Sequence, residues 1–139
     1  MSYLLDTNVV SETERKLPDR NVLKWLERTD PGNTYLSALT LGEIKKGVSK
    51  LPAGKRKAHI QNWLEDVRKQ FGGRILPITE QTFLVWGKMM AEFEQKGIVR
   101  PALDSFLEAT ALEHDLILVT RNIRNFRDSS VTILNPWED

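Results

Sequence analysis

Hydrophobic residues follow two alternating patterns along the chain. Short apolar runs, which suit buried strands, are separated by stretches in which apolar residues return at every third or fourth position, as on one helix face. The runs occupy residues 2–5, 34–37, 74–78, 116–119 and 131–134. The helical stretches occupy residues 7–14, 39–49, 55–71 and 79–96, with further helices expected after Asp19 and from Pro101. This alternation predicts an α/β fold: a three-layer sandwich whose central, mostly parallel sheet of about four or five strands is flanked by helices.

Cap and turn residues mark the ends of several of these elements. Asp19 and Thr79 are of the type that caps helix N-termini, since their side-chain oxygens accept hydrogen bonds from free backbone N–H groups. Residues 30–33 read Asp-Pro-Gly-Asn, a strong turn signal, and Gly72-Gly73 ends the helix predicted before it.

Length and composition indicate the class of protein but say little about its function. The chain has 139 residues, which is about one domain, and no cysteine, which excludes disulfides and suits a reducing cytoplasm. Its 20 basic and 19 acidic residues nearly cancel, so only a local patch of charge can indicate a nucleic-acid partner. No apolar run approaches the ~18 residues of a membrane span, and no signal peptide is expected.

Four polar residues stand at matching positions in the predicted fold. Asp6 follows the first strand, Glu43 lies early in the helix after the second, Asp104 lies in the first turn of the helix before residues 116–119, and Asn122 follows that strand. Functional groups of open α/β sheets gather at the carboxyl ends of the strands. Oxygen ligands without histidine or cysteine suit Mg²⁺ or Mn²⁺, so the pattern predicts a magnesium site.

Each of the four residues also has a simpler interpretation. Asp6 is a good N-cap, and Asp104 complements the positive start of a helix. Glu43 can pair in solvent with a neighbouring lysine, and Asn122 suits a turn with positive φ. Together these interpretations leave the coincidence of three acids and an amide unexplained, which favours a shared site.

The same residues lie within longer strings that resemble the PIN-domain ribonucleases, specifically the VapC toxins and their FitB-like relatives. The strings are LLDTNVVSE at residues 4–12, SALTLGEIKKGV at 37–48, LVTRNIRNF at 118–126 and the closing Asn-Pro-Trp at 135–137. The likeness runs end to end, so it implies a single PIN domain over residues 1–139. It further implies a Mg²⁺-dependent endoribonuclease, the toxin of a type II toxin–antitoxin pair, whose usual substrates are transfer or ribosomal RNA.

Carried over residue by residue, the resemblance places Asp6, Glu43 and Asp104 on the family's acidic motif positions. The fourth acid of many PIN domains falls on Asn122, which can ligate a hard cation through its carbonyl but adds no charge. Asn125 and Glu108 also depart from the family pattern, in which an Asp and an Ala are frequent. Glu108 lies one helical turn after Asp104, so it is either a further acid at the site or a residue of its rim, and the rim is favoured.

The implied mechanism is hydrolysis of a phosphodiester by a metal-activated water. Asp6 and Asp104 are the first candidates for metal ligands, and Glu43 binds the metal directly or through water, or orients the nucleophile. Residues expected to hold these carboxylates in place are Thr7, Asn8, Thr120 and Asn122. Such a site needs no histidine, so His59 and His114 are not expected to be catalytic.

RNA also requires cations near the acids, because its phosphates would otherwise be repelled. Arg121 and Arg124 follow the last acid-bearing strand, with Arg127 at the same spacing, and Arg100 precedes the Asp104 helix. We expect phosphate contacts from Arg100, Arg121 and Arg124. The basic cluster at residues 55–57 is interpreted as a solvated helix start.

The resemblance also implies protein partners. The family is usually dimeric, and the helix at residues 79–96 supplies apolar residues for a homodimer interface: Trp86, Met89, Met90 and Phe93. The expected antitoxin is VapB-like or FitA-like. Its C-terminal segment would order on binding, place a basic residue among the acids and lie in an apolar groove near Val22, Leu26 and Leu41. Through the antitoxin, a larger assembly would form on DNA.

Other functions fit the residues less well. A signalling receiver needs a pair of acids after the first strand, and an Asp-x-Asp phosphatase needs a second Asp where Asn8 stands. The alternative kept open is a PIN-like domain that binds RNA or a protein partner with weak or no nuclease activity, since the fourth acid is absent.

Overall fold

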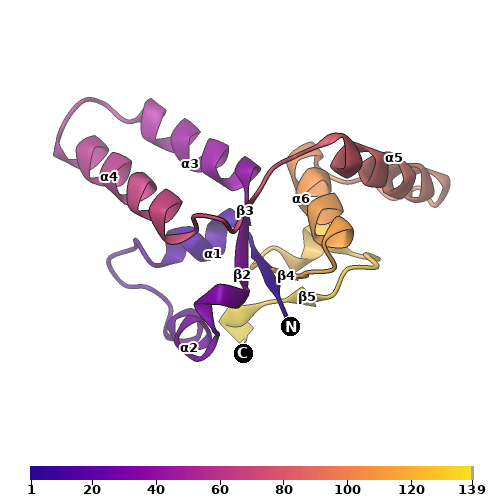
Figure 1. The fold of residues 1–139 in the computed structure, drawn as a ribbon, viewed down its shortest axis with the longest axis horizontal. Helices are drawn as coiled ribbons and strands as arrows, with labels where there is room; N and C mark the ends of the chain where they lie inside the picture. The colour runs from indigo at the N-terminus through magenta and orange to yellow at the C-terminus, as the bar shows by residue number, and fades with distance from the viewer. Residues whose placement is uncertain (139) are drawn as a thin grey trace.

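The computed structural model describes residues 1–138, which form a five-stranded parallel sheet covered by helices on both faces (Figure 1). The strands are β1 (Tyr3–Leu5), β2 (Thr34–Ser37), β3 (Ile75–Leu76), β4 (Ile117–Val119) and β5 (Ile133–Leu134). The α-helices are α1 (Thr7–Glu12), α2 (Arg20–Arg28), α3 (Ala38–Lys50), α4 (Lys55–Gln70), α5 (Glu80–Gln95) and α6 (Ala102–Glu113). Short 3-10 helices are η1 (Pro31–Asn33), η2 (Ile123–Phe126) and η3 (Pro136–Glu138).

The first strand lies at the centre of the sheet, whose order is β3-β2-β1-β4-β5. In register, Leu4 pairs with Leu118 of β4, and Leu5 with Val119. Because all neighbouring strands are parallel, their carboxyl ends meet at one edge. The predicted α/β fold with a mostly parallel sheet is confirmed.

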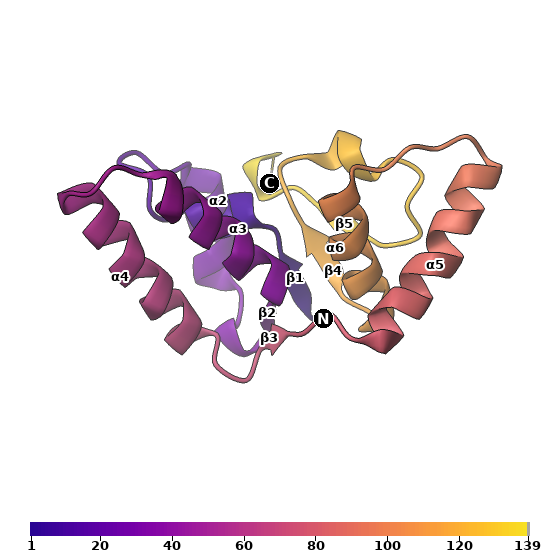
Figure 2. The ribbon, with the colours of Figure 1, turned by 90° about the horizontal axis from the view of Figure 1, so that it is seen from above.

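Alternating side chains on the central strands build two separate cores. Leu5 and Val119 face the cluster that includes residues of α1 to α4, whereas Leu4 and Leu118 face the cluster that includes α6. Seen from above, α3 and α4 lie on one side of the strands and α5 and α6 on the other (Figure 2). All four of these strand residues are at most 2% exposed.

The predicted caps explain where two helices begin. Asp19 accepts hydrogen bonds from the backbone N–H groups of Asn21 and Val22, at 2.8 and 3.3 Å, and starts α2. Thr79 starts α5 in a capping box with Thr82. Such caps satisfy donors that the helix itself leaves free.

The edge strands and the first helix are shorter than predicted. The run at 74–78 yields only the two residues of β3, because Pro77 has no N–H with which to extend an edge strand. The run at 131–134 yields β5, since the N–H of Val131 instead donates to the Ser129 hydroxyl. Helix α1 ends at Glu12 rather than at residue 14. Thr13 caps its C-terminus, and the Thr13 hydroxyl donates a hydrogen bond to the Val10 carbonyl.

The apolar face of α5 is used mainly inside the molecule. Met89 and Phe93 are buried against Ala109 of α6, and Trp86 and Met90 pack against the same cluster. Core packing therefore accounts for the four residues expected at a dimer interface. Between residues 1 and 138, none of the helices combines the length and apolar character that a membrane crossing requires.

Candidate active site

Asp6 lies at the carboxyl end of β1, in the middle of the sheet edge. Its side chain accepts hydrogen bonds from the backbone N–H of Thr7 at 2.7 Å and from the Thr120 hydroxyl at 2.8 Å. The residue is 7% exposed and also serves as the N-cap of α1. The N-cap interpretation of Asp6 is therefore confirmed. The cap uses one carboxylate oxygen, and the Thr120 hydroxyl contacts the other.

Thr120 and Asn8 hold Asp6 from the neighbouring strand and helix. Thr120, at the end of β4, is fully buried, and its hydroxyl accepts a hydrogen bond from the backbone N–H of Asn122 at 3.0 Å. The Asn8 amide lies 3.4 Å from both the Asp6 carboxylate and the Thr120 hydroxyl. All four residues expected to support the acids thus contact Asp6 or Thr120, namely Asn8 and Thr120 through their side chains and Thr7 and Asn122 through their backbone N–H groups.

Glu43 reaches the same edge from α3. The Thr7 hydroxyl lies 2.7 Å from its carboxylate and is the donor, so Thr7 links Glu43 to the loop of Asp6. The alternative pairing with Lys45 is not observed, because the Lys45 ammonium donates to the Gln61 side chain at 2.9 Å.

Asp104 lies in the first turn of α6 and is held from the far side of the site. The Asn125 amide donates to its carboxylate at 3.0 Å. Asn125 comes from η2, directly after the predicted strand end, and was not among the expected site residues. The sequence did single it out, because the family frequently has an Asp at this position. The amide of Asn125 donates a hydrogen bond at a place where a second carboxylate would repel Asp104.

The structure contradicts the turn interpretation of Asn122. Its φ is −89°, so it does not occupy a positive-φ turn, and its side chain is exposed at the start of η2. Its contribution to the described network is the backbone hydrogen bond to Thr120.

Burial and neighbouring charges shift the pKa values of Asp6 and Asp104. Burial raises the pKa of Asp6, against the lowering effect of its hydrogen bonds from Thr120 and Thr7, and the negative charges of Asp104 and Glu43 raise it further. Burial likewise raises the pKa of Asp104, and Glu43 adds to this. Carboxylates in this arrangement favour either a proton or a bound cation.

The donor set suits a hard divalent cation, although the carboxylates do not form a closed cage. Within residues 1–138, no three acidic or histidine side chains stand close enough to complete a metal site together. Asp6, Asp104 and Glu43 supply only oxygen atoms, each held by a hydrogen bond from a neighbouring side chain or backbone group. Such oxygens are the ligands that Mg²⁺ accepts, usually with several waters retained.

Arg100 and Glu108 correct two predictions. Their side chains are 2% and 1% exposed and form an ion pair at 2.8 Å, with a second contact at 3.4 Å. The Arg100 guanidinium also donates to the Arg127 carbonyl and lies 4.3 Å from the Phe93 ring centroid. Arg100 is therefore not free to contact phosphate, and Glu108 is a buried partner rather than a rim residue.

The other arginines expected to contact RNA remain at the surface. Arg121 and Arg124 are exposed, and the Arg121 guanidinium lies 5.3 Å from the centroid of the Trp137 ring. The backbone N–H of Arg121 donates to the Asn8 side chain at 3.4 Å, which ties this segment to the loop that carries Asp6.

Known proteins are similar to this chain over nearly its whole length. A family model described as the PIN domain matches residues 3–130. The chain is 38% identical over 136 residues to the VapC ribonuclease Y4jK of Sinorhizobium fredii, which covers 97% of each chain. It is 36% identical over 137 residues to toxin FitB of Neisseria gonorrhoeae, covering 98% of this chain and 99% of FitB.

Solved structures share the fold. A chain in the crystal structure of FitAcB from Neisseria gonorrhoeae matches with a TM-score of 0.93 at 36% identity, covering 99% of both chains. A chain of VapBC2 from Rickettsia felis, bound to a DNA fragment from its promoter, matches with a TM-score of 0.80 at 28% identity, covering 97% of this chain and 98% of that chain.

Replacing Asp104 with Asn should stabilise the metal-free protein at about pH 7, because a raised pKa means that ionisation costs free energy in the folded state. Asn keeps an acceptor for Asn125. The gain should shrink as the pH falls through the raised folded-state pKa and vanish well below the unfolded value of 3.8, where wild-type Asp104 is protonated in both states. Urea unfolding in excess chelator measures it, with Asp66→Asn on the exposed side of α4 as the control. Lower stability of Asp104→Asn at neutral pH would contradict this account.

Replacing Glu108 with Gln should destabilise the protein by about 3–5 kcal/mol, because it leaves the Arg100 charge buried without a counter-charge. The matched control is Glu65→Gln, which breaks the Glu65–Arg68 pair, whose side chains are 47% and 56% exposed. That change should cost less than about 1 kcal/mol. Chemical unfolding of both variants tests the difference, and equal losses would refute a special role for the buried pair.

Proposed function

The chain belongs to the PIN-domain family, and we propose that it is a single-domain, Mg²⁺-dependent endoribonuclease that acts as the toxin of a type II toxin–antitoxin pair. One observation carries the proposal. Three carboxylates from different elements, those of Asp6, Glu43 and Asp104, lie at one sheet edge and are fixed by hydrogen bonds. Burial and neighbouring negative charges raise the pKa of Asp6 and of Asp104. The names of the VapC and FitB relatives support the same activity and role.

Asp6 and Asp104 would hold the cation, with Glu43 acting directly or through water. A bound Mg²⁺ supplies Lewis acidity toward a phosphoryl oxygen and makes water a better nucleophile at neutral pH. The chain's own contribution is positioning, since Thr120 fixes the orientation of Asp6, the Thr7 hydroxyl that of Glu43 and the Asn125 amide that of Asp104. Neutral Asn122 and Asn125 add no charge, which favours one tightly held cation over two; Mn²⁺ should substitute.

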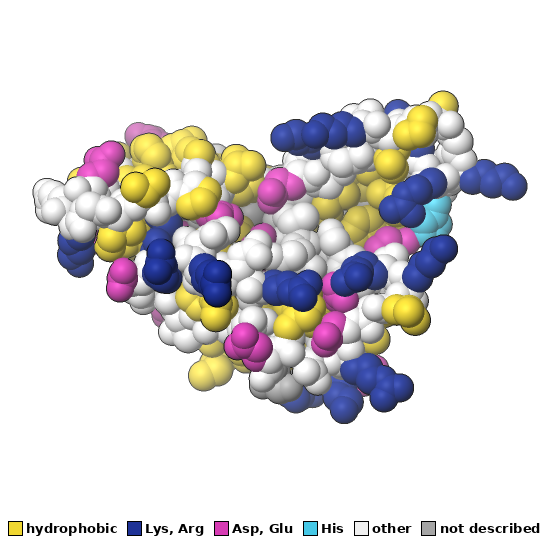
Figure 3. Space-filling model, turned by 180° about the vertical axis from the view of Figure 1, so that it is seen from behind, with side chains coloured by type: hydrophobic (Ala, Val, Ile, Leu, Met, Phe, Trp, Pro, Cys, Tyr) yellow, Lys and Arg dark blue, Asp and Glu magenta, His cyan; other side chains and the backbone are white. Residues whose placement is uncertain are grey.

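RNA must approach this acidic edge with help from cations. Arg121 and Arg124 follow β4 and are exposed, so they are suited to phosphate contact. A row of Lys and Arg side chains crosses one face of the molecule, with Asp and Glu side chains between them (Figure 3). We propose transfer or ribosomal RNA as the substrate, in the cytoplasm, where the absence of cysteine also fits.

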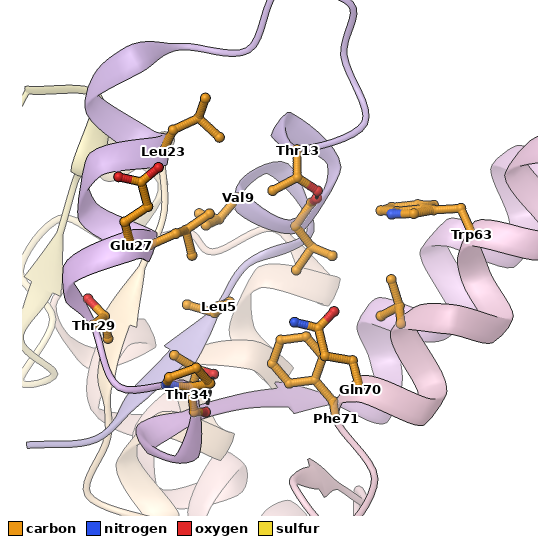
Figure 4. Close-up of a pocket in the computed structure, with 14 residues that line it drawn as sticks. Leu5, Val9, Thr13, Leu23, Glu27, Thr29, Thr34, Trp63, Gln70 and Phe71 are labelled. Carbon is orange, nitrogen blue, oxygen red and sulfur yellow. Dashed lines mark hydrogen bonds between the residues drawn. The ribbon is translucent and has the colours of Figure 1, made fainter.

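An antitoxin would bind an apolar hollow between α2 and α4, which we call the α2–α4 hollow. Its volume is about 350 Å³, and its wall includes Leu23 and Leu26 of α2 and Trp63 and Val67 of α4 (Figure 4). Of the three residues expected to border the apolar groove, Val22, Leu26 and Leu41, only Leu26 lines this hollow. Val22 is fully buried, and Leu41 packs against the core.

The comparison structures of FitAcB and VapBC2 support a partner of this kind, and the DNA in the VapBC2 structure supports assembly on DNA through the antitoxin. We also propose a homodimer, now through other residues of α5 and α6. Phe83, Leu84 and Leu103 are 49%, 64% and 48% exposed. Core packing leaves these apolar side chains uncovered, so they are available for a symmetric interface.

The second candidate is a PIN-like domain that binds RNA or a partner without cutting. It is favoured by the neutral Asn122, because many PIN domains have a fourth acid at this position and this chain has only three. Cleavage assays separate it from the enzyme.

Cleavage of RNA should require Mg²⁺ or Mn²⁺ and should fall at least about 100-fold in Asp6→Asn and Asp104→Asn, because each change removes a negatively charged ligand. His59→Ala and His114→Ala should retain activity, since no step assigned to the chain uses an imidazole. The measurement is the cleavage rate of labelled transfer RNA and ribosomal RNA with and without chelator. Full activity in chelator would refute the metal mechanism, and RNA binding without any cleavage would favour the second candidate.

Replacing Leu23 with Ser should weaken antitoxin binding about tenfold, because burying a leucine side chain contributes roughly 1.5–3 kcal/mol. Leu23 lines the hollow but does not belong to the buried core cluster, so folding should be unaffected. Leu112→Ser, at a leucine of α6 that is 40% exposed, is the control. Titration calorimetry with the antitoxin encoded beside this chain tests both variants, and unchanged binding by Leu23→Ser would place the partner elsewhere.

A further inference from the structure

A groove runs outward from the acidic edge between α1, α3 and α4. It has a volume of about 750 Å³, and we call it the α3–α4 groove. At its inner end it is lined by Thr7 and Glu43, which are hydrogen-bonded to each other at 2.7 Å. The backbone N–H of Thr7 donates to Asp6, so the groove opens directly beside the proposed catalytic carboxylates.

The groove carries three cations along its outer part. Arg15 and Lys16 follow α1 on one wall, and Arg56 begins α4 on the other. Arg15 pairs at 3.3 Å with buried Glu12, yet its side chain remains 60% exposed. For Lys16 and Arg56, both exposed, residues 1–138 supply no hydrogen-bond or ion-pair partner. Lys16 and Arg56 are therefore available to bind an anionic ligand.

The acids near the outer groove bind groups other than Lys16 and Arg56. Glu14 is hydrogen-bonded to the His59 side chain of α4. Glu12 accepts from Arg15 and from the backbone N–H of Asp19, the latter at 2.8 Å. Glu43 belongs to the acidic edge itself. Lys16 and Arg56 thus line the same groove as Thr7 and Glu43 without being paired to its acids.

Between the cations, the groove has an apolar wall. Ile60 and Trp63 of α4 line it together with Val48 of α3 and Leu51, which caps the C-terminus of α3. Aromatic and aliphatic side chains of this kind pack against nucleobases without selecting their sequence. Figure 3 shows a hollow with hydrophobic side chains between Lys and Arg side chains, next to a histidine.

We propose that the α3–α4 groove binds the single-stranded RNA segment that flanks the scissile phosphate, with Lys16 and Arg56 contacting its phosphates and the Ile60–Trp63 wall receiving a base. The proposal rests on the nuclease function proposed above and specifies where its substrate lies. Continuity with the acids and unpaired positive charge favour RNA here. A protein segment is better matched to the α2–α4 hollow, whose lining is mainly apolar.

The experiment uses the full-length protein and a fluorescein-labelled single-stranded oligoribonucleotide, with chelator present so that binding is measured without cleavage. The test variant is Lys16→Gln with Arg56→Gln. Fluorescence anisotropy should show a Kd raised about tenfold, and a plot of log K against log salt shallower by about 1.4, since each lost phosphate contact on a single strand removes about 0.7 from the slope.

The matched control is Lys88→Gln with Lys96→Gln, which removes the same charge from α5. In both views α5 lies at the opposite end of the molecule from α4 (Figures 1 and 2). The control should leave the Kd and the salt slope near those of the unaltered protein. Thermal melting should be unchanged in both variants, because all four side chains are exposed.

Three results would overturn the proposal. Equal weakening by the test and control variants would mean that net charge, not the groove, binds RNA. Unchanged RNA binding by Lys16→Gln with Arg56→Gln, combined with weaker antitoxin binding, would make the groove a protein site while leaving the nuclease function intact. Failure of the unaltered protein both to bind RNA in chelator and to cleave it with Mg²⁺ would overturn the nuclease function itself, and this inference with it.

Discussion

The hydrogen bond from the Thr120 hydroxyl to the Asp6 carboxylate is the contact on which the site depends. It joins the ends of the two central strands, one step beyond the paired residues Leu5 and Val119. The strands are held in register by cores on both faces, so a shift of one residue would bury the wrong side chains. The rigidity of the sheet thereby sets the position of a carboxylate that is costly to ionise where it stands.

Around that fixed point, the site balances negative charge against the groups that hold it. Thr7, Thr120 and Asn125 donate hydrogen bonds that favour the ionised carboxylates, whereas burial and mutual repulsion oppose ionisation. The Arg100–Glu108 pair has no net charge, although its two members act on Asp104 in opposite directions. This arrangement leaves the acidic edge without an internal cation of its own, which is the condition under which an external one binds well.

The sequence was sufficient for features that depend on local pattern. Small polar residues after apolar runs predicted the positions of Asp6 and Thr120, because a strand end in a parallel sheet is a defined place. Asn125 and the buried Arg100–Glu108 pair escaped prediction, since both depend on how α6 packs against η2 and α5. A charged residue in a sequence is ordinarily interpreted as exposed, and only the three-dimensional contacts identify a pair that satisfies itself in the interior.

Trp63 links the two surfaces that this protein would use. Its side chain lines the α2–α4 hollow on one side and the α3–α4 groove on the other, so α4 forms a wall of both. A segment that fills the hollow therefore contacts the same helix that borders the RNA path. An antitoxin anchored there needs only a short extension past α4 to cover Lys16, Arg56 and the acidic edge. On the proposed function, inhibition would then follow from shared use of one helix, without any change in the positions of Asp6, Glu43 and Asp104.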